Sequence, residues 1–234
     1  MSGFDYSLSP SKLSLLADCA RCFYDANKLK IERPRGIFPS LPGGVDRVMK
    51  EVCDQRRPQL PTHLLDHHLL ADAQLWGTKE QIGKLRHWKS GLKATVDVGG
   101  TIVSLIGALD DLIVHSNNTF SPFDTKTKGD VPKDDGAQYY QAQLDIYALF
   151  LRENGMPPSG RAFLDYWYPV TMTEGPMEWG NVLYELTADP ERALTLVAKA
   201  VAVLEGGQPD ADPTCEYCRF AQKRVDAALA CVTP

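Results

Sequence analysis

The chain has 234 residues, of which 44% are hydrophobic and 24% charged, and its formal net charge is −5. This length and balance fit one large or two small globular domains with an ample core, and they argue against a disordered chain. The acidic net charge excludes a surface that is basic all over, although a local basic groove would be enough to bind nucleic acid. The sequence has no apolar run of the roughly 18 to 20 residues that a membrane helix needs, and no signal peptide pattern at its start. We therefore expect an intracellular, cytoplasmic protein with no membrane partner.

The first 92 residues predict helices. Ser9 and Pro10 mark a helix start, as a capping residue followed by proline at the first helical position. The proline- and glycine-rich run 32–44 predicts an ordered loop, and a helix is expected after it over about 45–56. A further helix is expected over about 79–92, because four apolar residues would share its inner face: Ile82, Leu85, Trp88 and Leu92.

The sequence then changes to a pattern of β-strands. Three strands over 93–98, 101–115 and 119–128 are expected to form an antiparallel meander, with turns at Gly99-Gly100 and Asn117-Asn118. The later elements are a helix over 136–153, strands over 161–173 and 178–186, a helix over about 189–206, and a tail that ends in a short helix. This order predicts an α/β or α+β fold with a central mixed β-sheet flanked by helices.

Asp124 and Lys126 carry the main chemical signal, because side chains two residues apart on a strand point to the same face. The preceding strand brings Asp110 and Asp111 near them. Two carboxylates on neighbouring strands can hold Mg²⁺ or Mn²⁺ through oxygen ligands, and such a cation activates water and stabilises a phosphoryl oxyanion. Lys126 would orient the attacking water or neutralise charge on the transition state.

The register of this hairpin decides which acidic residue faces Asp124. A two-residue turn at Asn117-Asn118 would pair Asp111 with Asp124. An odd-length loop, or a bulge near Pro122, would instead pair Asp110 with Asp124. The sequence leaves both registers open.

Six cysteines include two Cys-x-x-Cys pairs at opposite ends of the chain: Cys19, Cys22, Cys215 and Cys218. This spacing is more typical of metal or cluster ligation than of disulfides in a protein of this length. Four thiolates suit either a [4Fe-4S] cluster or structural Zn²⁺, and such a site would join the first helix to the tail. Cys231 is an alternative fourth ligand, and Cys53 is expected to be a buried thiol.

The helix after the hairpin places Gln143 and Tyr147 one turn apart, on one face, where they could contact a phosphate or position Lys126. Together the motifs resemble the PD-(D/E)XK nucleases, in the branch of RecB-type helicase-nucleases and CRISPR adaptation exonucleases: Gly107-x-x-Asp110, Asp124-Thr125-Lys126 and Gln143-x-x-x-Tyr147, with the opening Ser9-Pro10-Ser11 and the closing Cys215-Glu216-Tyr217-Cys218. The resemblance implies that Asp110, in preference to Asp111, and Asp124 bind the metal. It also implies that Lys126 is catalytic and that Gln143 and Tyr147 support the site and the DNA.

The same resemblance implies one domain over residues 1–234 with a restriction-endonuclease-like core. Its activity would be a Mg²⁺- or Mn²⁺-dependent deoxyribonuclease, of exonuclease type, acting on single-stranded DNA or duplex ends. Partner proteins would be helicases or proteins of recombination, repair or adaptation, in a prokaryotic or phage-like setting. The resemblance also favours an iron-sulfur cluster over zinc at the four cysteines.

Two departures from the family pattern leave alternatives. Members of this branch often carry a histidine on the helix before the sheet, which this chain lacks, so Asp46 or Glu51 becomes the candidate third ligand. Iron-sulfur members usually have a third C-terminal cysteine where this chain has Arg224. A catalytically inactive DNA-binding or assembly module on the same fold is therefore the second hypothesis, and a zinc-stabilised interaction protein is the third.

Overall fold

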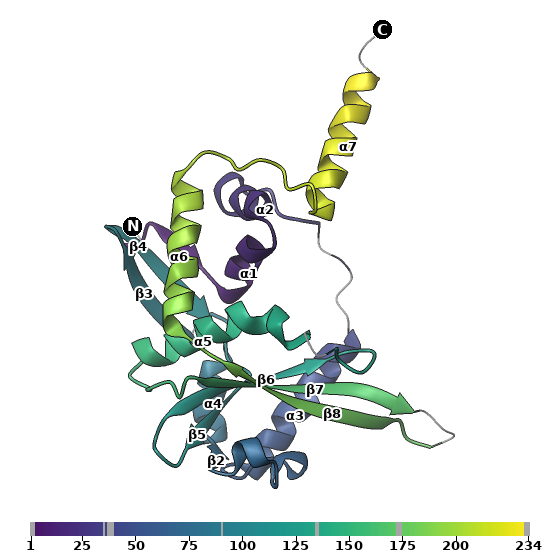
Figure 1. Ribbon diagram of the computed structural model, residues 1–234. Helices are drawn as coiled ribbons and strands as arrows, with labels where there is room; N and C mark the ends of the chain where they lie inside the picture. The colour runs from purple at the N-terminus through teal and green to yellow at the C-terminus, as the bar shows by residue number, and fades with distance from the viewer. Residues whose placement is uncertain are drawn as a thin grey trace.

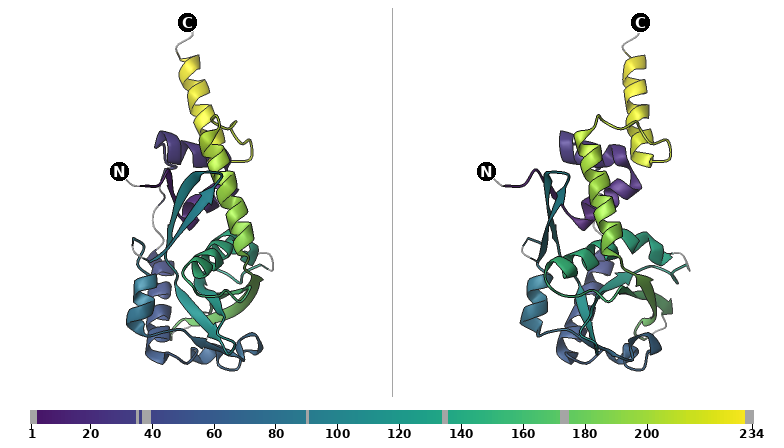
Figure 2. Two further views of the ribbon diagram at one scale, coloured as in Figure 1. Left: turned by 90° about the vertical axis from the view of Figure 1, so that its left-hand side faces the viewer. Right: turned by 60° about the vertical axis from the view of Figure 1, so that its left-hand side comes forward.

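Two mixed β-sheets surrounded by helices make up the protein (Figure 1 and Figure 2). The computed structural model describes residues 3–34, 36, 40–89, 91–133, 136–171 and 175–231. The central sheet has the order β2 (Ala73–Leu75), β5 (Asp111–His115), β6 (Phe120–Thr127), β7 (Arg161–Thr171) and β8 (Glu178–Thr187). Since β6 and β7 run parallel and the other neighbours antiparallel, the predicted mixed sheet flanked by helices is confirmed.

A smaller sheet has the order β1 (Tyr6–Leu8), β4 (Thr101–Gly107) and β3 (Leu92–Val98). The predicted three-strand meander is therefore wrong, because the run 101–115 is two strands that belong to different sheets. The first of them ends at Gly107, where a Cβ atom would lie 2.6 Å from a ring carbon of Phe150. The chain leaves the small sheet at this point and enters the central sheet at Asp111. Asp110 lies in the break between the two strands.

The two hairpins differ in loop length. Gly99-Gly100 forms the expected two-residue turn, and both glycines have the positive φ that such a turn requires. The β5–β6 loop has an odd number of residues between its last paired positions, with Asn118 at φ 59°. Asp111 consequently pairs with Phe123. The two-residue alternative for this loop is wrong, and the odd-length alternative is the one that the structure has.

Helix α5 (Gln141–Glu153) is the crossover between the parallel strands β6 and β7, and it lies at the centre of the main core. All residues from Leu144 to Leu151 are buried. α1 (Pro10–Asp18) and α6 (Pro190–Glu205) pack on it, both begin where predicted, and the structure shows a capping side chain followed by proline at each start. Ser9 caps α1 and Asp189 caps α6.

The helices before the sheets differ in their limits from the prediction. α3 (Ser40–Arg56) starts earlier than the expected 45, which is compatible with Pro42 because the first turn of a helix tolerates proline. Part of the expected loop 32–44 lies outside the described residues. α4 (Lys79–Leu85) starts with a capping box but ends seven residues early. Trp88 is therefore 70% exposed and not part of an inner helix face.

The C-terminal helix α7 (Glu216–Ala230) projects away from the body, and its first turn meets α2 (Ala20–Tyr24) (Figure 1). It is longer than the short helix that we expected for the tail. Cys19 and Cys22 lie at the start of α2, and Cys215 and Cys218 lie at the start of α7. Among the described helices, none has the length and apolar character needed to cross a membrane.

Candidate active site

Two carboxylates meet where the small sheet passes into the central one. The register of β5 and β6 places Asp110, in the break before β5, beside Asp124 on β6. Asp124 is 1% exposed. Burial and the neighbouring charge of Asp110 raise the pKa of Asp124 to about 7. In the absence of a cation, the site therefore resists the ionisation of both carboxyls at once.

Lys126 follows on the same face of β6, as the strand periodicity predicts. Its ammonium forms an ion pair with Asp124 and lies 4.6 Å from the centre of the Tyr140 ring. Burial disfavours the charged ammonium, but the carboxylates of Asp124 and Asp110 outweigh this effect, and the pKa of Lys126 is raised. The lysine is therefore a fixed positive charge beside the two aspartates.

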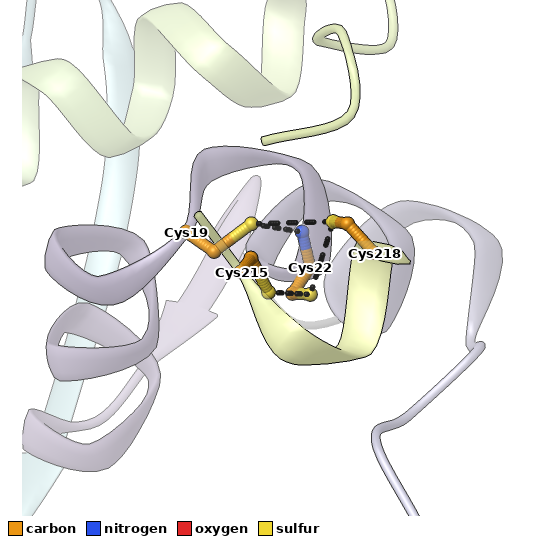
Figure 3. A group of neighbouring side chains, drawn as sticks. All are labelled: Cys19, Cys22, Cys215 and Cys218. Carbon is orange, nitrogen blue, oxygen red and sulfur yellow. Dashed lines mark hydrogen bonds between the residues drawn. The ribbon is translucent and has the colours of Figure 1, made fainter. Parts of the chain in front are cut away.

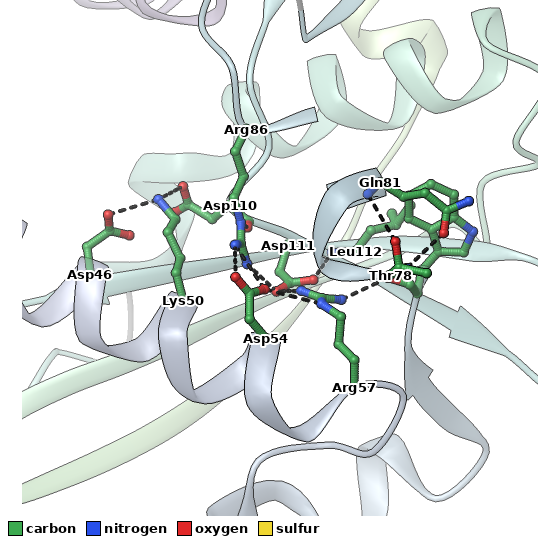
Figure 4. A network of polar contacts seen from close by, with 11 residues as sticks. Asp46, Lys50, Asp54, Arg57, Thr78, Gln81, Arg86, Asp110, Asp111 and Leu112 are labelled. Carbon is green, nitrogen blue, oxygen red and sulfur yellow. Dashed lines mark hydrogen bonds and ion pairs between the residues drawn. The ribbon is translucent and has the colours of Figure 1, made fainter. Parts of the chain in front are cut away.

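Helix α3 adds a second lysine and a third aspartate (Figure 4). The Lys50 ammonium lies 2.7 Å from Asp110 Oδ1 and 2.8 Å from Asp46 Oδ2. Burial disfavours its charge, but Asp110 and Asp46 outweigh burial and raise the pKa of Lys50. Glu51 points elsewhere, because it pairs with Arg47 on an exposed part of α3. Of the two candidates for a third ligand, Asp46 is the one at the site.

An open hollow of about 370 Å³ lies over these groups. It is lined by Pro42, Gly43, Asp46, Asp110, Thr125, Lys126, Thr127 and Tyr140. The hollow thus exposes one side of the carboxylate and lysine cluster to a ligand from solvent.

Asp111 lies in a separate, buried network (Figure 4). Arg57 and Arg86 both form ion pairs with its carboxylate, and both also pair with Asp54. Arg86 Nε donates a hydrogen bond to the backbone oxygen of Asp110 at 2.6 Å. This network therefore fixes the break between β4 and β5, and it uses Asp111 for structure while leaving the Asp110 side chain at the site.

Gln143 and Tyr147 meet on α5, as their spacing predicts. Gln143 Nε2 donates to the Tyr147 hydroxyl at 2.6 Å. Tyr147 is 4% exposed, and burial, with the charges of Asp124 and Asp110 as further causes, raises its pKa well above the usual range. A neutral tyrosine is therefore fixed behind the two aspartates, while Gln143 lines a neighbouring groove.

The four cysteines form a compact buried group between α2 and α7 (Figure 3). The sulfurs of Cys19 and Cys218 are 3.6 Å apart, those of Cys22 and Cys215 are 3.7 Å apart, and all four lie within 4.8 Å of one another. Burial and the neighbouring cysteines raise the pKa of Cys22 to about 12, with Arg33 acting in the opposite direction. A bound cation would favour the thiolates, and the donor set fits either zinc or an iron-sulfur cluster.

Arg33 lies against this group. Its Nη2 atom donates to Cys215 Sγ at 3.4 Å, and its guanidinium lies 4.4 Å from the centre of the Tyr217 ring. It also pairs with Asp18. Cys231 is exposed and is not a member of the group, and Cys53 is buried in the core under α3, as expected.

The site contains two aspartates and a lysine in chain order, and the chain that carries them also matches the model of a known family. The family model of the PD-(D/E)XK nuclease superfamily matches residues 7–222. The chain belongs to this superfamily. A solved structure described as the crystal structure of SSO0001 is 15% identical, with a TM-score of 0.46 over 95% of this chain and 87% of that one. The comparison with curated proteins gave no match.

PD-(D/E)XK nucleases use divalent metals. A buried aspartate with a raised pKa beside a second carboxylate is a pair that a divalent cation would stabilise, since oxygen ligands of this kind suit Mg²⁺ and Mn²⁺. In the described part of the chain, however, the four cysteines are the one group of three or more candidate ligands within 4.8 Å. Asp46, Asp110 and Asp124 do not form such a group. Lys50 lies between Asp46 and Asp110.

The sequence interpretation missed Lys50, Arg86 and Arg33. Lys50 had a local signal, because Asp46 and Lys50 are four residues apart and therefore neighbours on a helix. Arg86 and Arg33 had none, because their partners are distant in the sequence.

Proposed function

We propose that this PD-(D/E)XK protein is a Mg²⁺- or Mn²⁺-dependent deoxyribonuclease of the RecB-type branch that removes nucleotides from DNA ends. Asp110 and Asp124 hold the cation, with Asp46 as the third ligand. The contact between the Asp110 and Asp124 carboxyls, with Lys126 ion-paired to the buried member, carries the proposal. The substrates are single-stranded DNA or duplex ends.

Each side chain has a defined task in this reaction. A divalent cation, when bound, supplies Lewis-acid stabilisation of the phosphoryl oxygen and lowers the pKa of a coordinated water. Lys126 orients the attacking water and offsets the negative charge that grows on the phosphoryl oxygens. Tyr147 and Gln143 lie on the face of α5 behind the carboxylates and support the site. Lys50 provides a positive charge between Asp46 and Asp110 until a cation binds there.

The experiment combines substrates and variants. Purified protein is incubated with Mg²⁺ or Mn²⁺ and with end-labelled linear DNA, single-stranded or duplex, beside closed circular DNA of the same sequence. We expect loss of label from linear substrates and intact circles. Asp124→Ala and Lys126→Ala should abolish this activity, whereas Lys93→Ala, an exposed lysine on β3, should retain it. Undiminished cleavage by Asp124→Ala would refute the mechanism, and cleavage of circles would refute exonuclease action.

An inactive DNA-binding or assembly module is the second candidate, and one observation favours it. The Lys50 ammonium binds Asp46 and Asp110, so the chain itself provides a cation where a metal would be needed. Cleavage in Mn²⁺ separates the two candidates, and the variant Lys50→Ala is tested beside the wild type so that the lysine itself cannot be the reason for a lack of cleavage. A nuclease cleaves DNA with or without Lys50 when Mn²⁺ is present. A module binds DNA, and neither the wild type nor the variant cleaves it.

The four cysteines are proposed to hold a [4Fe-4S] cluster, with Zn²⁺ as the alternative. This centre connects α2 and α7 and makes residues 1–234 one domain. Anaerobic purification distinguishes the two cofactors, because a cluster absorbs near roughly 400 nm whereas zinc is colourless. A colourless protein with one zinc per chain would refute the cluster, and it is also the result expected of a zinc-stabilised interaction protein. The proposed partners are helicases or proteins of recombination, repair or adaptation. The proposed setting is the cytoplasm of a prokaryote or of phage-infected cells.

A further inference from the structure

Tyr139 is a large aromatic side chain that is not buried in the core. It lies in the short 3-10 turn Gly136–Tyr140 that leads into α5, and it is 82% exposed. Its ring meets the Tyr140 ring edge-on, with ring centres 5.2 Å apart. Tyr140 in turn lies 4.6 Å below the Lys126 ammonium. Two ring contacts thus connect an exposed aromatic surface to the lysine of the candidate active site.

A groove of about 390 Å³ extends from this pair of tyrosines toward the four cysteines. We call it the tyrosine groove, and its lining comes from α1, α5 and the segments between them: Pro10, Ser11, Ser14, Leu15, Asp18, Arg33, Tyr139, Tyr140 and Gln143. The groove begins beside the hollow over the aspartates, since Tyr140 lines both. A ligand that occupies one is therefore adjacent to the other.

The chemistry of the lining indicates what kind of ligand fits. Asp18 forms an ion pair with Arg33, so the groove offers little net positive charge. Attraction to phosphates is therefore a weak source of affinity here. The hydroxyls of Ser11 and Ser14 are neutral polar groups of the type that position a nucleic-acid backbone. Among the residues that line the groove, Tyr139 is the large hydrophobic side chain that is exposed, at 82%, and aromatic side chains bind unpaired bases by stacking.

We propose that the tyrosine groove binds the unpaired end of a DNA strand, with Tyr139 as the stacking platform for one base. This inference rests on the proposed deoxyribonuclease function, and it assigns Tyr139 as a residue that selects substrates. A base inside a duplex has both faces covered by its neighbours, and the terminal pair of a blunt end exposes one face only and stays hydrogen-bonded to its partner, so a single base enters the groove most readily from an unpaired strand end. The groove therefore favours strands whose end is unpaired over blunt duplexes.

Binding is measured by fluorescence anisotropy with a labelled short single strand and with the blunt duplex of the same sequence. Ca²⁺ replaces Mn²⁺, and a gel confirms that the DNA stays intact. Tyr139→Ala should weaken single-strand binding by about fivefold to a hundredfold, which is the loss of one stacked base. Tyr139→Phe keeps the ring and should bind as the wild type does. Trp88→Ala is the matched control, because Trp88 is an exposed aromatic residue away from the groove.

Three results would overturn the inference. The first is an affinity of Tyr139→Ala for the single strand within about twofold of the wild type. The second is a loss of single-strand affinity in Trp88→Ala equal to that in Tyr139→Ala. The third is a loss of duplex affinity in Tyr139→Ala equal to its loss of single-strand affinity. A second measurement does not depend on the variant's folding: a terminal 2-aminopurine in the strand should lose fluorescence on binding wild-type protein, and an unchanged signal contradicts stacking. Cleavage in Mn²⁺ is assayed in parallel. If the protein cleaves DNA but its single-strand binding does not depend on Tyr139, the proposed role of the groove is refuted and the nuclease function stands. If single-strand binding depends on Tyr139 but no DNA is cleaved, the nuclease function is refuted and the role of the groove stands.

Discussion

Replacing Asp124 by asparagine should stabilise the metal-free protein while abolishing its activity. Asparagine has the shape of the aspartate but no charge. The pKa of Asp124 rises from its ordinary value of 3.8 to about 7, first because of burial and then because of Asp110. Folded protein therefore binds more protons than the unfolded chain between about pH 4 and pH 7, and stability falls as the pH rises through this range.

The size of the effect follows from the two pKa values. Their difference corresponds to about 4 kcal/mol, at about 1.36 kcal/mol for each pKa unit. The attraction of Lys126, which lowers the pKa of Asp124, is already included in this difference, so we expect Asp124→Asn to be more stable by up to about 4 kcal/mol at pH 8. For a chain of this size each kcal/mol raises the melting temperature by about 2–4 °C.

The assay is thermal unfolding in EDTA at several pH values and again with Mn²⁺. The advantage of Asp124→Asn should shrink as the pH falls from 7 toward 4 and vanish below the ordinary pKa of 3.8, where the wild-type carboxyl is neutral in both states. Added Mn²⁺ should stabilise the wild type and leave the variant unchanged. A variant less stable than the wild type at pH 8 in EDTA would show that burial does not destabilise the Asp124 carboxylate, which would then need no cation to offset its charge.

Four further substitutions test other parts of the structure. Gly107→Ala should lower the free energy of unfolding in urea by about 1–3 kcal/mol, because its methyl group would lie 2.6 Å from the Phe150 ring. Gly83→Ala, in open space on α4, should raise the free energy of unfolding by about 0.5–1 kcal/mol. Arg86→Gln should destabilise by about 3–5 kcal/mol in the same assay, since it leaves buried carboxylates with one arginine fewer, and a loss below about 1 kcal/mol would contradict the role of the network. Arg33→Gln should lower the metal content per chain of the cysteine centre, because it removes a positive charge beside the thiolates. Metal content is measured by elemental analysis after dialysis against a chelator. Equal retention of metal by variant and wild type would contradict this.

Several elements could be predicted because their signals act within a few residues. The cap at Ser9 and the cap at Asp189 each satisfy backbone amides one turn away, and both helices start where these residues predict. Gly99-Gly100 fixes its turn through its own φ angles. The helical spacing of Gln143 and Tyr147 likewise predicted their contact. Each of these features depends on local geometry alone.

Other predictions failed where distant contacts decide the structure. The run 101–115 has a continuous strand pattern, and its division at Gly107 depends on the position of Phe150 in α5. The end of α4 after Leu85 depends on Gly91, whose backbone packs so closely against Gly107 and Leu85 that no side chain would fit. Neither contact has a trace in the local pattern of apolar residues.

The sequence by itself determined where α1 and α6 begin, the family motif with Asp110, Asp124 and Lys126, and the cysteine spacing. The tertiary structure alone decided that Asp110 lies beside Asp124 while Asp111 is held in the arginine network. The physical reason is that a strand has a period of two, so a loop longer by one residue exchanges the two faces. Such a loop is selected by long-range pairing in the sheet, and the sequence of the turn is compatible with either length.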